Sequence, residues 1–491
     1  GINFTNLTTS LIPLRLKTIN THRVLGCSIY KLRAISLIES IVICLISYIL
    51  ALFIVNDLSY TPIANWVDAD IRLSQYKGLI LLTALIAILT GCLAGLYPAI
   101  RSTSYAPALV LKGSFGLSPK GKKVRVALIG FQYTVSIALI IVTLFMGLQN
   151  HFMTSSEQLG FNKDQVAIVN LTPEIYAKHK PQYIQKLKDY PGIEDVAFSV
   201  YELSKEDDMI DLEYARHEDK DVFFKVFYAS ENFLSVMDIQ VEEGRDFTRE
   251  DLNKAQSDYI INPAAERDFH LHPGDRFNDR TVLGVSKDFR FNSCRIASSP
   301  FVFALNNDIP NPKLVSYIRF NSKTNLQEAV AHVRETLKEI DPTFPFEISF
   351  YNTILNNLYQ KEQTLGKLIS LFGIMAILIS IVGVFGLVLF ETQYRRKEIG
   401  IRKINGATTG QILLMFNKTY IRIVSVCFII SIPIAWMGTQ QWLENFAYKT
   451  PLHLWVFIVA FLIILSVTIG TVTFRNWQAA NENPVNSVKS E

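Results

Sequence analysis

The sequence predicts an α-helical membrane protein that carries an extracytoplasmic α+β domain, and three observations support this. Hydrophobic residues make up 49% of the 491 residues and the mean hydropathy is +0.22, which is too apolar for an ordinary soluble chain. Charged residues still make up 19%, which is too polar for membrane helices alone. One long polar stretch, residues 149–365, lies between runs of about 20 apolar residues, the length that crosses a bilayer.

Residues 1–33 are interpreted as the end of a membrane helix followed by a basic cytoplasmic segment. Residues 34–111 then hold two spans, and the first of them contains a single charge, Glu39. An inward face or the membrane interface must accommodate this carboxylate. In the second span, Gly91 and Gly95 have the small-residue spacing that lets a neighbouring helix approach closely.

The other spans flank the polar stretch. A cytoplasmic linker is predicted at 112–125, because it holds lysines and no acid. The further predicted ranges are 126–148 for the third span, 366–390 for the fourth, 391–416 for a cytoplasmic helix, 417–475 for two last spans and 476–491 for a cytoplasmic tail. Both termini are then cytoplasmic. Few charges lie in these spans, which argues against a pathway for ions or sugars.

The polar stretch has a strand–helix–strand pattern at each end. The predicted elements are 165–171, 181–189 and 196–201 in the first unit and 315–320, 326–340 and 346–351 in the second. This order predicts a split βαβ, or ferredoxin-like, part, interrupted by a β-rich lobe at about 223–303. Asn352–Lys367 is predicted to run into the fourth span as one helix without a breaker.

The segment Glu391–Gln411 is short, basic and enclosed by two spans. Its isoleucines, among them Ile399 and Ile401, alternate with basic residues in a pattern typical of an amphipathic helix at the membrane surface. Asn405-Gly406 is predicted to end this helix, and Ala407-Thr408-Thr409 to cap the next one. The alternative interpretation is a basic loop that only sets the topology.

A looser copy of this segment occurs near the start of the chain. His22-Arg23-Val24-Leu25-Gly26-Cys27-Ser28 has the layout of Arg402-Lys403-Ile404-Asn405-Gly406-Ala407-Thr408. Each copy is followed by a span, an outside loop, a second span and a tail that contains a proline, within Tyr105–Lys112 and Asn483–Lys489 respectively. The sequence therefore predicts two copies of one membrane module.

The motif RRKEIGIRKINGAT, followed by two spans and a tail ending in NPVNSVKS, resembles the last membrane module of FtsX/MacB-type permeases of ABC transporters. The stretches YASENFLSVMDIQVEEGRDF, IINPAAERDF and LGVSKDFRF look like the periplasmic domain of MacB-type permeases, which has a ferredoxin-like part and a β-rich lobe. The resemblance implies that the short cytoplasmic helix docks on an ATPase subunit. The coupling residues that it implies are Glu391, Arg395, Arg396, Lys397, Glu398, Ile401, Arg402, Lys403, Gly406, Ala407 and Thr408.

The resemblance also implies partners and a location. ATP is expected on the separate ATPase subunit and no cofactor on this chain. A second permease chain, identical or related, is expected in the complex, together with membrane lipids and a periplasmic or outer-membrane partner. The expected location is the bacterial inner membrane. Export of a peptide or drug, extraction of lipoproteins and activation of a cell-wall hydrolase are the expected outputs, and the alternative is a membrane sensor or adaptor scaffold that does not transport.

The two copies differ where coupling would require acidic residues. In the register of the repeat, Leu11 and Thr18 take the places of Glu391 and Glu398, which puts a coupling role of the first copy in doubt. The family often carries an external domain in each module. The expectation is therefore a truncated chain or a split gene, and no secretory signal peptide is expected at Gly1.

No catalytic or metal-binding pattern is found in the sequence. It holds neither a GxxxxGK[ST] phosphate loop nor a nucleophile elbow, so ATP hydrolysis by a Walker-type mechanism is not expected. His270 and His272 lie near two aspartates, but the sequence places no third ligand beside them, and a solvated turn is preferred. The acidic cluster from Glu206 to Asp211 is interpreted as a solvated face. The net charge of +4 gives no reason to expect nucleic acid as a partner.

Overall fold

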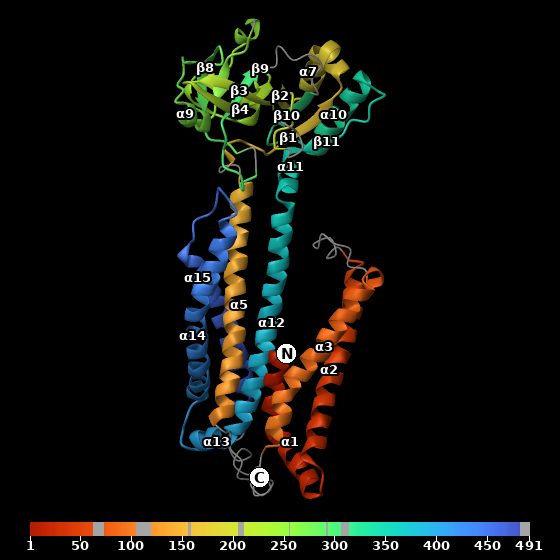
Figure 1. The fold of residues 1–491 in the computed structure, drawn as a ribbon, viewed down its shortest axis with the longest axis vertical. Coiled ribbons are helices and arrows are strands. Elements are labelled where there is room, and N and C mark those ends of the chain that lie inside the picture. Colours follow the sequence, from red (N-terminus) through yellow and green to blue (C-terminus); the bar gives the residue numbers. More distant parts are fainter. Residues whose placement is uncertain are drawn as a thin grey trace. The chain divides into compact units, whose positions relative to one another are not determined.

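A computed structural model describes residues 1–61, 73–104, 119–155, 159–204, 211–254, 256–290, 293–305 and 314–481 (Figure 1). The chain forms two compact units. We call Gly1–Gly147, Thr364–Gln441 and Leu452–Glu491 the helical unit, and Leu148–Gln363 with Trp442–Pro451 the sheet unit. The sequence features that lie outside the described residues are the first part of the linker, both proline-containing tails and the acidic residues 206–208.

The helical unit accounts for the predicted membrane spans. Among the described residues, six helices are long and apolar enough to cross a membrane, in the predicted order. They are α2 (Ile29–Leu58), α3 (Lys77–Ser102), α5 (Pro119–Thr154), α12 (Gln360–Tyr394), α14 (Thr409–Leu443) and α15 (Leu454–Asn481). The helix α1 (Ile2–Val24) precedes them, and the short 3-10 helix η2 (Leu73–Gln75) precedes α3. Helix α5 begins at Pro119, within the predicted linker, where proline suits a first helical turn.

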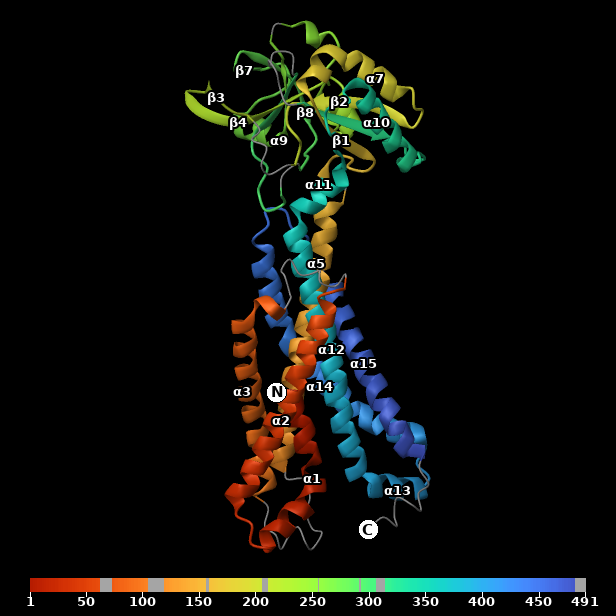
Figure 2. The same ribbon diagram turned by 90° about the vertical axis from the view of Figure 1, so that its right-hand side faces the viewer.

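Helices α2 and α3 pack at very short range, as the two glycines predict. A Cβ added to Gly91 would lie 3.0 Å from the Ile41 Cα, and one added to Gly95 would lie 2.5 Å from the Ser40 Oγ. Any larger residue would therefore push the two helices apart. Figure 2 shows α2 and α3 side by side, with α1 next to them.

The sheet unit contains the predicted split βαβ part. Its strands lie in the order β11-β1-β10-β2, and every neighbouring pair is antiparallel. The strands are β1 (Val166–Leu171), β2 (Ile193–Ser199), β10 (Leu314–Phe320) and β11 (Ile348–Phe350). The crossover helices are α7 (Lys180–Lys188), which follows a π-helical turn at Ile175–His179, and α10 (Leu326–Ile340), which has the predicted bounds. The ferredoxin-like prediction is confirmed.

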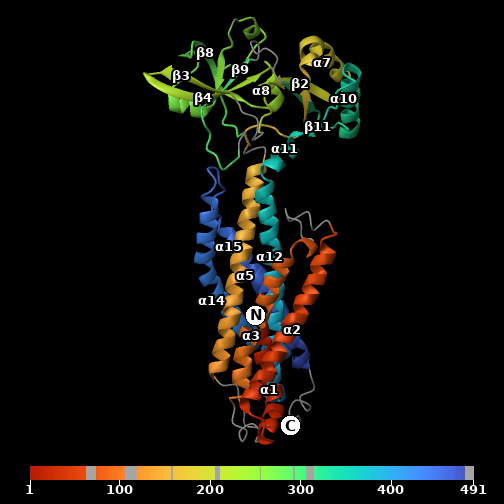
Figure 3. The ribbon, with the colours of Figure 1, turned by 45° about the vertical axis from the view of Figure 1, so that its right-hand side comes forward.

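The β-rich lobe is also present, but it begins at Asp211 and not at Phe223. Its strands are β3 (Asp211–His217), β4 (Lys220–Ala229), β5 (Val241–Gly244), β6 (Tyr259–Ile261), β7 (Arg276–Phe277), β8 (Arg280–Ser286) and β9 (Phe301–Leu305). Its helices are α8 (Phe233–Met237), η4 (Asp251–Asn253) and α9 (Pro263–Phe269). One pair, Ser199 with Ala229, joins β2 to β4, so a single sheet continues through both parts (Figure 3).

Apolar residues cover both faces of the sheet, which explains the nearly continuous apolar strands. On β1, Ala167 and Val169 face a core shared with α7 and α10, whereas Val166 and Ile168 face a second core with Phe233 of α8. A third core, around Phe277, lies inside the β-rich lobe. Strands that are buried on both faces lose the alternation of apolar and polar residues.

The prediction of one uninterrupted helix from Asn352 to Lys367 is wrong. Helix α11 (Tyr351–Leu358) ends before Tyr359, whose φ of −107° and ψ of 15° are not helical, and α12 begins at Gln360. The Tyr359 ring is buried, and its hydroxyl accepts a hydrogen bond of 3.1 Å from the Cys294 backbone N–H. Packing of this ring inside the sheet unit explains a break that periodicity does not reveal.

Candidate functional site

The candidate coupling segment is a separate short helix. Helix α12 ends at Tyr394, Arg395 has a non-helical φ of −91° and ψ of 10°, and α13 (Arg396–Ile404) follows. Figure 2 shows α13 crosswise at the end of α12. The predicted short helix is therefore confirmed, and it is set apart from the span that precedes it.

The turn after α13 has the predicted stop and cap. Gly406 has a φ of +89°, a left-handed conformation that glycine adopts without strain. The Gly406 N–H donates to the Lys403 carbonyl at 3.0 Å, and the Ala407 N–H donates to the Arg402 carbonyl at 2.9 Å. Thr408 then caps α14, because its hydroxyl oxygen accepts from the Gln411 N–H at 3.3 Å.

The acidic residues of the segment form ion pairs with its arginines. The Arg395 guanidinium lies 3.3 Å from a Glu391 carboxylate oxygen and 3.9 Å from Glu398, and Glu398 also pairs with Arg402 at 2.8 Å. The Tyr420 hydroxyl of α14 donates to Glu391 at 3.2 Å. Glu391 of α12 thus contacts both Arg395, which precedes α13, and Tyr420 of α14. These contacts fix the position of Arg395 relative to α14.

One side of α13 is buried and another is exposed. Ile399 is only 3% exposed, whereas Ile401 is 55% and Ile404 is 65% exposed, with Arg402 exposed beside them. Gly406 and Thr408 are exposed as well, and Lys403 and Ala407 are half-buried. The side chains of Arg396 and Lys397 lie outside the described part of the structure. The exposed isoleucines with a neighbouring guanidinium form a surface suited to a protein partner.

Hydrogen bonds between helices anchor the segment, and the sequence did not reveal them. Asn476 of α15 shares a bond of 2.6 Å with Thr392 of α12, and Asn417 of α14 donates to Thr473 of α15 at 2.9 Å. Inside a membrane unit such polar contacts hold helices together. The only signal in the sequence was the presence of these polar residues near the ends of apolar runs.

The first module repeats the same turn at an offset of 380 residues, from His22 to Arg402. Gly26 has a φ of +92°, its N–H donates to the Arg23 carbonyl at 3.0 Å, and the Cys27 N–H donates to the His22 carbonyl at 2.9 Å. Ser28 caps α2 at 3.3 Å, as Thr408 caps α14. The predicted repeat is confirmed at the level of individual hydrogen bonds.

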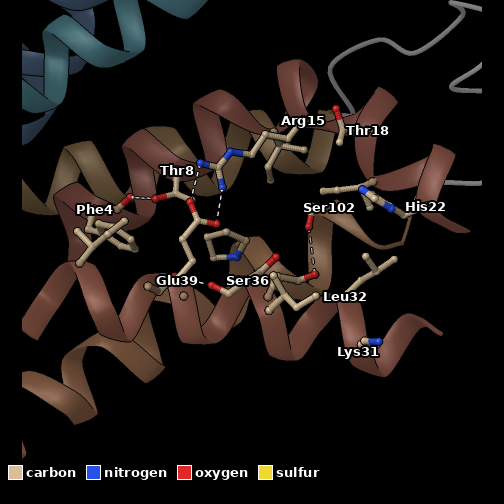
Figure 4. A pocket seen from close by; sticks show the side chains of 18 of the residues that line it. Phe4, Thr8, Arg15, Thr18, His22, Lys31, Leu32, Ser36, Glu39 and Ser102 are labelled. Atoms are coloured by element: carbon tan, nitrogen blue, oxygen red, sulfur yellow. Dashed lines mark hydrogen bonds and ion pairs between the residues drawn. The ribbon is translucent and has the colours of Figure 1, made fainter. Parts of the chain in front are cut away.

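The first module differs in its helix and in its charges. Helix α1 is continuous to Val24, so no separate short helix forms. Arg15, which the offset places opposite Arg395, makes two hydrogen bonds of 2.9 and 2.8 Å to Glu39 of α2 (Figure 4). This pair shows how Glu39 is accommodated in an apolar helix, which the sequence alone left open.

The region of His270 and His272 contains a group of metal-ligating residues that the sequence did not place together. His272 lies near Glu243 of β5 and Glu266 of α9, with ligand atoms within 4.8 Å of one another, and His270 is not in the group. His272 and Glu243 are exposed, and Glu266 is half-buried. The two glutamates are distant in sequence from the histidine, which explains why sequence analysis found no third ligand.

Comparisons with known proteins agree with the repeat. The family described as FtsX-like permease C-terminal matches residues 1–107 and 370–484, which hold the two predicted modules. The macrolide export ATP-binding/permease protein MacB of Aggregatibacter actinomycetemcomitans is 25% identical over 212 residues, which cover 40% of this chain and 32% of that protein. The MacB of Neisseria gonorrhoeae is 25% identical over 223 residues, 43% of this chain and 34% of that protein. The chain thus spans about a third of the length of these curated relatives.

Two solved structures are also similar to parts of the chain. The periplasmic region of MacB from Actinobacillus actinomycetemcomitans has a TM-score of 0.31 at 15% identity and covers 40% of this chain and 94% of that one. The extracellular domain of the noncanonic ABC-type transporter YknZ from Gram-positive bacteria has a TM-score of 0.28 at 16% identity and covers 38% of this chain and 98% of that one.

Among the described residues, six apolar helices in two copies of one module, together with a sheet unit, define a multi-pass membrane protein with one folded domain. Over these two modules the chain is similar to FtsX-like permeases, and over about two fifths of its length to MacB proteins, in agreement with the sequence resemblance. The helices fit an inner-membrane protein. The printed name of these MacB relatives includes an ATP-binding part as well as a permease.

Proposed function

We propose that the chain transmits ATP-driven motion of a separate ATPase subunit across the inner membrane to the sheet unit. In this proposal α13 docks on the ATPase in the cytoplasm, both termini are cytoplasmic, the sheet unit is extracytoplasmic, and a second permease chain completes the complex. The printed name of the relatives, macrolide export, favours export of a small molecule over extraction of lipoproteins or activation of a hydrolase.

The observation that carries the proposal is the continuity of α12. Its 35 residues begin at Gln360, within the sheet unit, and end at Tyr394, beside the residue that caps α13. At 1.5 Å per residue this helix is about 52 Å long, well above the roughly 30 Å of a hydrocarbon core. A displacement of α13 can therefore be transmitted along one helix, without a flexible linker.

A second connection supports the same mechanism. The loop between α14 and α15, Trp442–Pro451, belongs to the sheet unit. The buried amide of Gln149, near the end of α5, donates to the Tyr448 carbonyl at 3.0 Å and accepts from the Thr450 N–H at 2.8 Å. The Arg290 guanidinium lies 4.1 Å from the centre of the Tyr448 ring. The loop that follows α14 is thus held within the sheet unit by hydrogen bonds and a cation–π contact.

The exposure and the charge of α13 support its role as the docking surface. Ile401 and Ile404 are too exposed to stabilise the helical unit itself, and Arg402 is held beside them by Glu398. A basic segment between two spans belongs in the cytoplasm, where an ATPase acts. Insertion of the isoleucines into the membrane interface is the competing explanation, and the experiment below separates the two.

The test is purification of the full chain from its own membranes in mild detergent, with mass spectrometry of the proteins that co-purify. The test variant is Ile401→Asp with Ile404→Asp. The matched control is Val24→Asp with Leu25→Asp, which changes two similarly exposed apolar residues in the corresponding turn of the first module. We expect an ATP-binding subunit with the natural chain and the control, and its loss from the test variant.

Two results would contradict the proposal. If no ATP-binding subunit accompanies the natural chain, a sensor or adaptor scaffold becomes the better account. If the subunit stays bound to the test variant while the purified variant keeps its thermal stability, α13 is not the docking element.

A further inference from the structure

The first module contains a pocket that coupling to an ATPase does not use. It lies between α1, α2 and α3 and has a volume of about 750 Å³, within the usual range for small-molecule sites (Figure 4). Phe4, Ile12, Ile35 and Ile43 contribute to its apolar wall. Leu7 and Ile35, which also line it, are 42% and 53% exposed, so the pocket opens on the outer surface of these helices.

One end of the pocket is basic. His22 and Lys31 line it near the start of α2, and within the described residues Lys31 has no ion-pair partner. Ile43 lies twelve residues further along the same helix, which is about 18 Å at 1.5 Å per residue. The pocket therefore has a cationic end near the predicted cytoplasmic surface and an apolar end deeper in the helical unit.

The ion pair of Arg15 and Glu39 lies between these ends. Each carboxylate oxygen of Glu39 accepts one hydrogen bond from the guanidinium, at 2.8 and 2.9 Å. A guanidinium has five N–H donors, so Arg15 keeps donors for a further acceptor. Both side chains are more than 40% exposed, which leaves them accessible from the pocket.

The corresponding positions of the second module carry larger side chains. Ser36 and Ser40 line the pocket, and the offset of 380 residues places Phe416 and Tyr420 at the same positions. Phe416 is 3% and Tyr420 is 1% exposed, and the Arg395 guanidinium lies 5.8 Å from the Phe416 ring. The Phe416 ring is thus buried in the second module where Ser36 lines an open pocket in the first, whereas Ser40 packs closely against Gly95 of α3.

We propose that this pocket binds one anionic phospholipid of the surrounding membrane, with the phosphate beside Lys31 and His22 and an acyl chain along Ile12, Ile35 and Ile43. The free N–H donors of Arg15 then meet the ester carbonyls between head group and chain. Three features favour this occupant: the cationic end, the apolar end, and an opening formed by exposed apolar residues. The proposal does not depend on docking of an ATPase.

The test is native mass spectrometry of the purified full chain, titrated with phosphatidylglycerol and with phosphatidylcholine. The main variant, Ser36→Phe, which we call the filled variant, places in the pocket the ring that the second module carries at the corresponding position. Its control, Ser47→Phe, adds an aromatic ring to the same helix at an exposed serine that does not line the pocket. A second variant, Lys31→Gln, removes one charge from an exposed position and leaves the packing intact.

We expect the natural chain and Ser47→Phe to retain one phosphatidylglycerol in preference to phosphatidylcholine, and the filled variant to lose this preference. Lys31→Gln should bind phosphatidylglycerol about fivefold more weakly, as expected for one cation near an anionic head group. Glycerol 3-phosphate should not compete, which separates a lipid from a free phosphate.

The proposal is overturned if the filled variant retains phosphatidylglycerol like the natural chain, or if the two lipids bind the natural chain equally. Displacement of the lipid by glycerol 3-phosphate would also overturn it, because the apolar end would then contribute nothing. If the filled variant does not fold, as judged by thermal unfolding, Lys31→Gln decides alone, and unchanged affinity counts against the proposal.

Discussion

The two modules share a turn and differ in what surrounds it. Gly26 and Gly406 have nearly the same φ, +92° and +89°, and the helices that follow begin at Ile29 and Thr409, again 380 residues apart. The first module balances its arginine with one carboxylate on the next helix, whereas the second balances Arg395 with two, Glu391 and Glu398. The same turn thus follows a separate, charged helix in the second module and a continuous helix that borders an open pocket in the first.

A few side chains therefore decide what a repeated module can do. Ser36 lines an open pocket, whereas the corresponding Phe416 is a buried ring, and Tyr420, which corresponds to Ser40, hydrogen bonds to Glu391. Packing at this level is invisible in the pattern of apolar runs, which is the same in both modules. Substitutions at matched positions therefore test the comparison directly.

The largest expected effect comes from exchanging the side chains at the matched positions 36 and 416. Phe416→Ser should lower the free energy of unfolding by about 3 kcal/mol, because it removes a buried ring and leaves a cavity. Ser36→Phe should change it by less than about 1 kcal/mol, since the pocket has room for a ring. Thermal unfolding of the two purified variants in the same detergent measures the difference. Equal losses would show that the two positions are not structurally equivalent.

The second-largest expected effect is the loss of stability when the arginine of each module is removed from its ion pair. Arg15→Leu leaves Glu39 without its partner in an apolar helix, and we expect a loss of about 2 kcal/mol, near the cost of a charge within a membrane helix. Arg395→Leu should cost about half as much, because Glu391 keeps the Tyr420 hydroxyl and Glu398 keeps Arg402.

The control for the ion pair is the double variant Arg15→Leu with Glu39→Leu. It should recover most of the stability lost in Arg15→Leu, because no unpaired carboxylate remains. A double variant as unstable as the single one would mean that Arg15 acts through packing of its side chain and not through its charge.

The smallest effect should be common to both modules. Gly26→Ala and Gly406→Ala each force a side chain into a left-handed conformation, which costs about 1 kcal/mol. An added Cβ meets nothing within 4 Å at either glycine, so no steric difference separates them. Equal shifts of the melting temperature would confirm that the turn is shared. A shift in one module only would mean that the two turns contribute differently to stability.

Sequence patterns predicted the elements whose cause is local. The six spans follow from their apolar length, α10 from its amphipathic period, and the end of α13 from Asn405-Gly406. The expected coupling residues come from the resemblance alone, and the structure places four of them, Glu391, Arg395, Glu398 and Arg402, in one network of ion pairs.

What sequence analysis missed depends on contacts distant in the chain. Tyr359 interrupts a helix because its ring packs beside Cys294. Gln149 forms hydrogen bonds with a loop about 300 residues away in the chain. The partner of Glu39 was missed for the same reason, because Arg15 lies 24 residues earlier on another helix. The pocket was also missed, since its existence depends on how three helices pack.

The central claim is that the second module couples to the ATPase and the first does not. The most direct test measures ATP hydrolysis by the ATPase that co-purifies with the full chain, after Glu398→Lys and, separately, after Thr18→Lys, the matched change in the first module. We predict that Glu398→Lys lowers the hydrolysis rate about tenfold, a coupling effect of ordinary size, and that Thr18→Lys leaves it within about twofold. Equal losses in the two variants, or an unchanged rate in Glu398→Lys, would contradict the claim.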